Sequence, residues 1–66
     1  MYIILNGESK VIEPQTTITH LMKQFNYEIG IGAVAVNMVF IASGNYDKTI
    51  LKEGDKVEVL APVCGG

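Results

Sequence analysis

Several residue types are scarce or absent in this sequence, and each scarcity excludes a class of protein. The 66 residues include no tryptophan, no arginine, one cysteine and one histidine. A single cysteine cannot form an internal disulfide, and together with a single histidine it supplies too few ligands for a structural zinc site. The cysteine content is typical of a reducing compartment, so we expect a cytoplasmic protein.

Positive charge is also sparse. Five lysines are scattered along the chain, and the formal net charge is −2. Nucleic acids and anionic membrane surfaces are bound by clustered basic residues, and the sequence shows no such cluster. We therefore expect neither nucleic acid nor membrane among the partners.

Long apolar runs are missing as well. The longest, residues 31–42, is interrupted by Asn37 and is shorter than the roughly 20 residues that span a bilayer. Residues 1–6 lack the basic start and the cleavage site of a signal peptide. The sequence predicts neither a membrane span nor a secretory leader.

What is present indicates one small globular domain. Hydrophobic residues make up 48% of the chain and charged residues 18%. A chain of this length buries only about 60% of its unfolded surface, which leaves little room for a deep catalytic pocket. We expect a single domain over residues 1–66, with a tail at 62–66.

The first elements read as a hairpin. Residues 2–5 are apolar and β-branched, and Asn6-Gly7 is a strong turn signal. A two-residue loop would place Ile3 opposite Lys10, whereas a four-residue loop over residues 6–9 places it opposite Ile12. The second register pairs like with like, so it is the predicted one.

A helix and further strands follow. Thr17 is a predicted N-cap for a helix whose apolar face has the spacing i, i+3, i+4, i+7: Ile18, Leu21, Met22 and Phe25. The remaining elements are listed in chain order: a buried strand at 33–37, a short edge strand at 38–41, a helical turn at 46–49 and a last strand at 56–61. The order indicates an α+β fold with a mixed sheet of four to five strands packed on one main helix.

The chain ends in Gly65-Gly66, directly after the last strand. Glycine lacks a Cβ, so two glycines can enter a channel too narrow for other residues. The terminal carboxylate is ionised at neutral pH and can attack the α-phosphate of ATP in a partner enzyme. An inert, frayed tail is the alternative interpretation.

Four segments together resemble the ThiS family of thiamine-biosynthesis sulfur carriers, within the ubiquitin-like β-grasp superfamily. They are residues 4–8 (ILNGE), 33–37 (AVAVN), 51–58 (LKEGDKVE) and the terminal glycines. The resemblance covers nearly the whole chain and implies a β-grasp fold with a flexible C-terminal tail.

The resemblance also implies a function. A ThiF-like adenylating enzyme would use ATP and Mg to activate Gly66, with Gly65 needed for entry into its active site. A cysteine desulfurase or persulfide protein would supply the sulfur, and thiazole synthase would take it from the resulting thiocarboxylate. The carrier would then be a co-substrate and not an enzyme, with no metal or cofactor of its own; the sequence has no Gly-Lys-Ser/Thr phosphate loop.

Alternation along the strands predicts a partner surface. If Ile3, Leu5, Ile12, Val57 and Val59 face the helix, then Ile4, Val11 and Leu60 point outward and form one candidate docking patch. Cys64 and His20 receive no role, since neither has an identifiable activating neighbour.

Three other functions stay open at this point. A molybdopterin-synthase sulfur carrier shares the fold and the terminal glycines, and Pro62-Val63 gives it some support. A ubiquitin-like modifier would be joined through Gly66 to lysines of target proteins. A plain interaction module would carry an inert tail.

Overall fold

The computed structural model describes residues 1–62 of the chain. Within this part, strands and helices follow one another as β1 (Tyr2–Leu5), β2 (Glu8–Val11), α1 (Ile18–Gln24), β3 (Ala33–Val36), β4 (Val39–Ile41), the 3₁₀ turn η1 (Ser43–Asn45) and β5 (Lys56–Leu60). The strands and the helix lie at or within a few residues of the segments that hydrophobic periodicity predicts.

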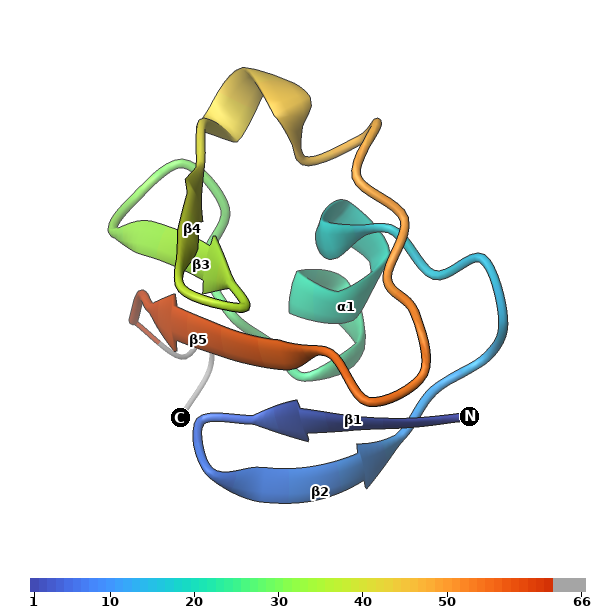
Figure 1. Cartoon of the computed structure of the whole chain (residues 1–66). Helices are drawn as coiled ribbons and strands as arrows, with labels where there is room; N and C mark the ends of the chain where they lie inside the picture. The colour runs from blue at the N-terminus through green and yellow to red at the C-terminus, as the bar shows by residue number, and fades with distance from the viewer. Residues whose placement is uncertain (63–66) are drawn as a thin grey trace.

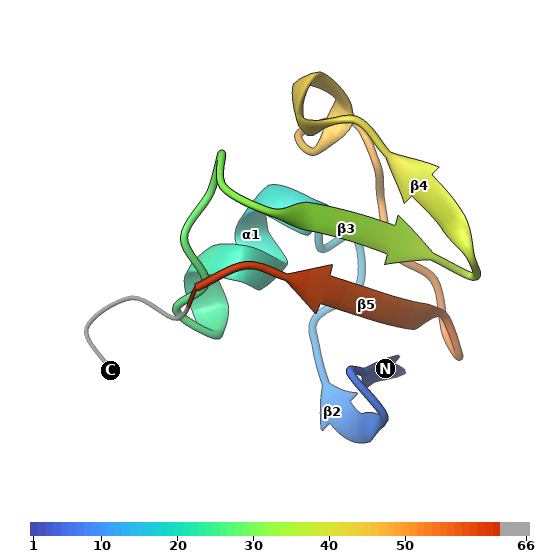
Figure 2. The ribbon, with the colours of Figure 1, turned by 90° about the vertical axis from the view of Figure 1, so that its left-hand side faces the viewer.

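The strands form one mixed sheet in the order β2-β1-β5-β3-β4 (Figure 1). β1 and β5 pair in parallel, and the neighbouring pairs are antiparallel. The first and last strands of the chain, β1 and β5, therefore lie side by side in the sheet. Helix α1 lies behind β3 and β5 when the molecule is turned by 90° from the view of Figure 1 (Figure 2).

The register of the first hairpin differs from the prediction. Ile3 lies opposite Lys10, so the loop has two residues, Asn6 and Gly7, and the predicted four-residue loop is wrong. Both loop residues have positive φ, +50° and +84°, as a type I′ turn requires, and this turn matches the twist of the flanking strands. Ile12 still reaches the core, because it exchanges two backbone hydrogen bonds with Met1.

Lys10 is tolerated opposite Ile3 because β2 is an edge strand. Its ammonium lies 5.8 Å from the centre of the Phe25 ring at the end of α1. It also lies 3.5 Å from a Glu8 carboxylate oxygen. The alkyl stem covers apolar surface while the charge stays at the rim, so side-chain likeness is a poor guide to register at this edge.

Helix α1 begins where the sequence places its cap. The Thr17 hydroxyl accepts a hydrogen bond from the His20 N–H at 3.2 Å. The apolar face predicted for the helix is buried at Ile18, Leu21 and Met22. Phe25 ends the helix and packs against the rim of the core.

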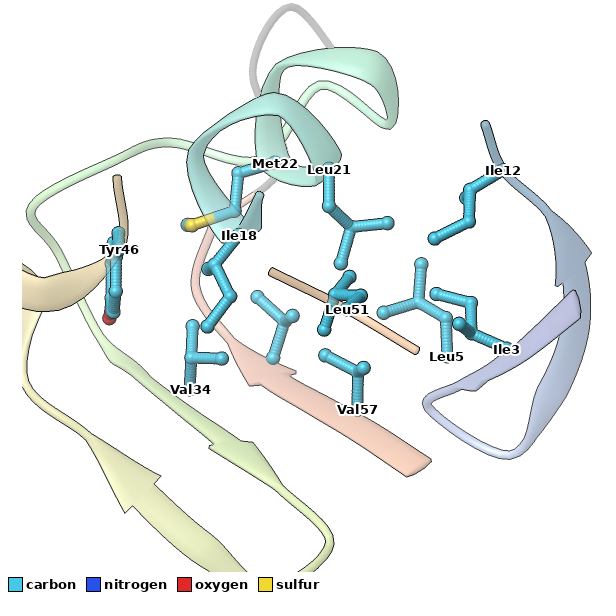
Figure 3. Packing of buried hydrophobic residues seen from close by; sticks show 11 residues of the cluster. Ile3, Leu5, Ile12, Ile18, Leu21, Met22, Val34, Tyr46, Leu51 and Val57 are labelled. Carbon is cyan, nitrogen blue, oxygen red and sulfur yellow. The ribbon is translucent and has the colours of Figure 1, made fainter. Parts of the chain in front are cut away.

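The core lies between α1 and the sheet (Figure 3). Residues predicted to face the helix are buried, namely Ile3, Leu5, Ile12, Val57 and Val59. Tyr46 and Leu51 also belong to the core, although both lie in the long connection between β4 and β5. The helical turn in this connection spans Ser43–Asn45, earlier than the predicted 46–49, and leaves Tyr46 free to point inward. In the part of the chain that the model covers, no helix has the length and apolarity needed to cross a membrane.

Candidate functional site at the end of the last strand

The chain leaves the domain from the middle of the sheet. β5 lies between β1 and β3, and Ala61 and Pro62 follow it as the last described residues. The predicted sulfur-carrying end, Gly65 and Gly66, and Cys64 lie outside the described residues. Because β3 pairs with β5 as far as Leu60, the segment that leads to this end departs from a fixed strand.

Asn6 binds the end of β5 through its side chain. Its Oδ1 accepts a hydrogen bond from the Val59 N–H at 2.8 Å, and its Nδ2 donates to the Val59 carbonyl at 3.2 Å. The same Nδ2 donates to the Tyr27 hydroxyl at 3.0 Å. The hairpin turn and the end of β5 lie at the same end of the molecule because β1 and β5 run in parallel (Figure 1).

The loop after α1 holds the segment that follows β5. The Glu28 N–H donates to the Pro62 carbonyl at 2.8 Å. Gly32 lies so close to the end of β5 that a Cβ built on it would lie 1.7 Å from the Leu60 carbonyl oxygen. Its φ of +93° also favours glycine. The path from Val59 to Pro62 is therefore bounded by the first turn and by this loop.

The three residues of the predicted docking patch all point away from the helix, but they are not contiguous. Val11 and Leu60 are 60% and 72% exposed, and Ile4 is half-buried. Ile4 pairs with Lys56, and Leu60 lies four residues further along β5, or roughly 13 Å at the usual rise per residue. Glu58 lies between them on the same face, so the single predicted patch is divided in two.

Leu60 has other apolar neighbours on this face. Ala33 pairs with Leu60, Ala35 pairs with Glu58, and Phe40 pairs with Ala35. Phe40 is 73% exposed, and the two alanines between it and Leu60 are small. The outer face thus carries an apolar strip of four residues near the end of β5: Leu60, Ala33, Ala35 and Phe40.

A shallow hollow lies beside this strip, between the first turn and β5. Its lining includes Asn6, Gly7, Lys56 and Glu58. Residues 1–62 hold no group of three His, Cys, Asp or Glu side chains placed to bind a metal ion. His20 is exposed on α1.

Sequence reasoning missed the contacts that hold the end of β5. Asn6 was recognised as a turn residue, but its side-chain partner Val59 is 53 positions away in the chain. Gly32 lies between the predicted helix and the predicted strand at 33–37, and nothing in the sequence indicates its approach to Leu60. The residue types indicate only that both positions favour positive φ. They do not indicate which part of the chain either residue contacts.

The chain is similar to one protein family and to two solved structures. A model of the ThiS family matches residues 3–66. A crystal structure of thiamine biosynthesis protein ThiS from Geobacter metallireducens superposes with a TM-score of 0.83 at 25% identity, and each chain is covered completely. A solution structure of a thiamine biosynthesis protein from the same organism gives a TM-score of 0.78 at 25% identity, with 100% of this chain and 88% of that chain covered.

One curated relative is much longer than this chain. The chain is 26% identical over its full 66 residues to a thiazole synthase from Paramagnetospirillum magneticum. It spans only 20% of the length of that relative.

Proposed function

The chain belongs to the ThiS family, and on that premise we propose that it carries sulfur, as a thiocarboxylate on Gly66, for the synthesis of the thiazole of thiamine. Its fold is the ubiquitin-like β-grasp, with one helix on a mixed sheet, as in the ThiS structure it resembles. The observation that carries the proposal is the family match over residues 3–66, which includes both terminal glycines.

The first step is activation of the terminus. The Gly66 carboxylate attacks the α-phosphorus of ATP in a ThiF-like adenylating enzyme, which also binds the Mg. A C–O–P linkage forms and pyrophosphate leaves. The carboxylate itself is a poor electrophile, and the adenylate supplies the leaving group that later substitution requires. In this proposal ATP and Mg are bound by the partner, and the carrier is a co-substrate without catalysis of its own.

The second step introduces sulfur. The terminal sulfur of a persulfide, held by a cysteine desulfurase or a persulfide protein, attacks the Gly66 carbonyl and displaces AMP. The product is an acyl disulfide, and a thiol then reduces its S–S bond by two electrons. The carrier is released as a thiocarboxylate, while the reducing thiol and the donor cysteine end as a disulfide.

Thiazole synthase is the proposed sulfur acceptor. Support comes from the relative named thiazole synthase, because one region of that longer protein matches the whole of this chain. A longer protein with this name that contains a region similar to the chain supports the proposal that carrier and synthase act on one another. A cytoplasmic location fits these partners and stays a prediction.

Two areas of the outer face are proposed to contact the partners. One is the apolar strip around Leu60, which lies next to the segment leading to the terminus. The other contains Ile4 and Val11, at the hairpin. The first area has the stronger support, because any enzyme that receives the terminus must also approach the end of β5.

Intact-protein mass spectrometry tests the proposal. The full chain is incubated with its cognate activating enzyme, ATP and a sulfur source. We expect the mass to rise by the difference between sulfur and oxygen, and fragmentation should place the change on Gly66. A chain lacking Gly65 and Gly66 is the control, and an unchanged mass of the full chain would refute the carrier function.

Transfer to acceptor enzymes then separates the related functions. The charged carrier is offered to thiazole synthase and, separately, to molybdopterin synthase. We expect sulfur to be lost only to the first. Preferential transfer to the second, or higher-mass conjugates in cells joined through Gly66, would favour the molybdopterin carrier or a protein modifier.

A further inference from the structure

Within residues 1–62, the end of β5 has no strand partner on the side of β1, and Asn6 fills that place. β1 ends at Leu5, and the Asn6 N–H makes a backbone hydrogen bond to the Val57 carbonyl at 2.9 Å. The next residue of β5 that faces β1 is Val59, and among the described residues its N–H and carbonyl are bound by the Asn6 carboxamide. The Asn6 carboxamide presents one acceptor and one donor to Val59, as a peptide group of a longer strand would.

The Asn6 side chain is itself held in place. Its second N–H group donates to the hydroxyl of Tyr27, which is half-buried in the loop after α1. The adjacent Glu28 N–H binds the Pro62 carbonyl. Asn6 thus joins β5 to the same loop that holds the last described residue, so the two contacts act on one short segment, residues 59–62.

Asn37 provides an internal comparison. It begins the two-residue turn between β3 and β4 with a φ of +51°, against +50° for Asn6. Its Oδ1 accepts from the Lys56 N–H at 3.0 Å, and its own N–H donates to the Lys56 carbonyl at 2.7 Å. Both asparagines therefore begin a turn and bind the backbone of β5, but Asn37 binds its first residue and Asn6 binds it near its end.

We propose that Asn6 is a positioning residue for activation of the carrier, acting through Val59 on the direction in which the chain leaves the domain at Pro62. This inference rests on the proposed function. Pro62 lies four residues before Gly66, so the direction at Pro62 determines which region the terminal carboxylate can reach. Binding then costs less conformational entropy, because residues 59–62 are already ordered in the free carrier. The activating enzyme should therefore bind such a carrier more tightly.

Paired glycine variants test the inference. Asn6→Gly and Asn37→Gly each remove one side chain, and glycine keeps the positive φ of the turn. Adenylation is followed as pyrophosphate release by the cognate activating enzyme at varied concentrations of the full chain. We expect Asn6→Gly to lower kcat/KM roughly tenfold, mainly through KM, and Asn37→Gly to change it less than about twofold.

A third variant and a structural readout separate positioning from stability. Tyr27→Phe removes only the hydroxyl that holds the Asn6 amide, and it should lower kcat/KM by roughly two- to fivefold. Amide hydrogen exchange should become faster at Val59 in Asn6→Gly and at Lys56 in Asn37→Gly. Equal kinetic losses in the two glycine variants, or faster exchange at Val59 with unchanged KM, would overturn the inference. Failure of the unaltered chain to be adenylated would instead overturn the proposed function, and the inference with it.

Discussion

Gly32 occupies a position that another residue can take only if the backbone moves. A Cβ there would lie 1.7 Å from the Leu60 carbonyl oxygen and 2.9 Å from the Ala61 Cα. Both neighbours are backbone atoms, so neither can rotate away as a side chain would. The contact fixes how closely the loop after α1 packs on the last strand.

Gly32→Ala is therefore expected to destabilise the protein more than Gly30→Ala. Gly30 has nearly the same φ, +94° against +93°, but nothing lies within 4 Å of a Cβ built on it. The difference between the two variants isolates the close approach, and we expect it to be about 1–3 kcal/mol in the free energy of unfolding. Urea denaturation measures both, and equal losses would show that the backbone conformation alone demands glycine.

Leu60→Asp tests the apolar strip on the outer face. Leu60 is 72% exposed and contributes little to the core, so the fold should be retained. A carboxylate in an apolar contact should raise the Kd for the activating enzyme or the synthase at least about tenfold, or about 1.4 kcal/mol.

Val11→Asp provides the comparison, because the register places Val11 in the other area of the same face. Titration of each variant with each enzyme gives the Kd values. Unchanged binding by Leu60→Asp, together with normal thiocarboxylate formation, would remove the strip from the partner surface. A loss in Val11→Asp alone would move the contact to the hairpin.

At the scale of the elements, α1 depends on its surroundings for its stability. It has seven residues, too few to be stable as an isolated helix in water. Its stability comes from the buried face formed by Ile18, Leu21 and Met22, and from the Thr17 cap. The stability of α1 therefore depends mainly on its packing against the sheet.

Removal of the cap should be measurable in so small a domain. Thr17→Ala leaves the His20 N–H without its side-chain acceptor and should lower the free energy of unfolding by about 0.5–2 kcal/mol. Thr17→Ser keeps a hydroxyl and should recover most of the loss. Chemical denaturation followed by circular dichroism compares the three proteins. If alanine and serine are equivalent at this position, the hydroxyl contributes nothing to the helix.

The β1–β2 hairpin shows that local turn chemistry outweighs side-chain likeness at a sheet edge. The predicted register paired Ile3 with Ile12, but Asn6 and Gly7 both adopt the positive φ of a two-residue turn. Lys10 then faces Ile3 without burying its charge, because β2 is the edge strand of the sheet formed by residues 1–62. The Asn-Gly pair was the more reliable of the two signals.

At the scale of the whole molecule, we predict that the folded domain and the sulfur-carrying terminus are separable. The described core and the hydrogen bonds of the sheet lie within residues 1–62. Deletion of Gly65 and Gly66 should therefore leave the unfolding midpoint unchanged while abolishing thiazole formation in a reconstituted reaction. A domain of unaltered stability that still supports thiazole formation would show that the terminus does not carry the sulfur.

The sequence by itself determined the α+β class, the helix with its cap, the inward set of residues on the strands and the terminal glycines. These are local properties, since periodicity and residue type are readable within a few positions. The hairpin register, the burial of Tyr46 and Leu51, and the contacts of Asn6 and Gly32 with β5 were decided by the tertiary structure. The physical reason for the last of these is distance along the chain: Asn6 and Val59 meet only once β1 and β5 lie in parallel, and no local pattern records which backbone group a side chain 53 positions away will bind.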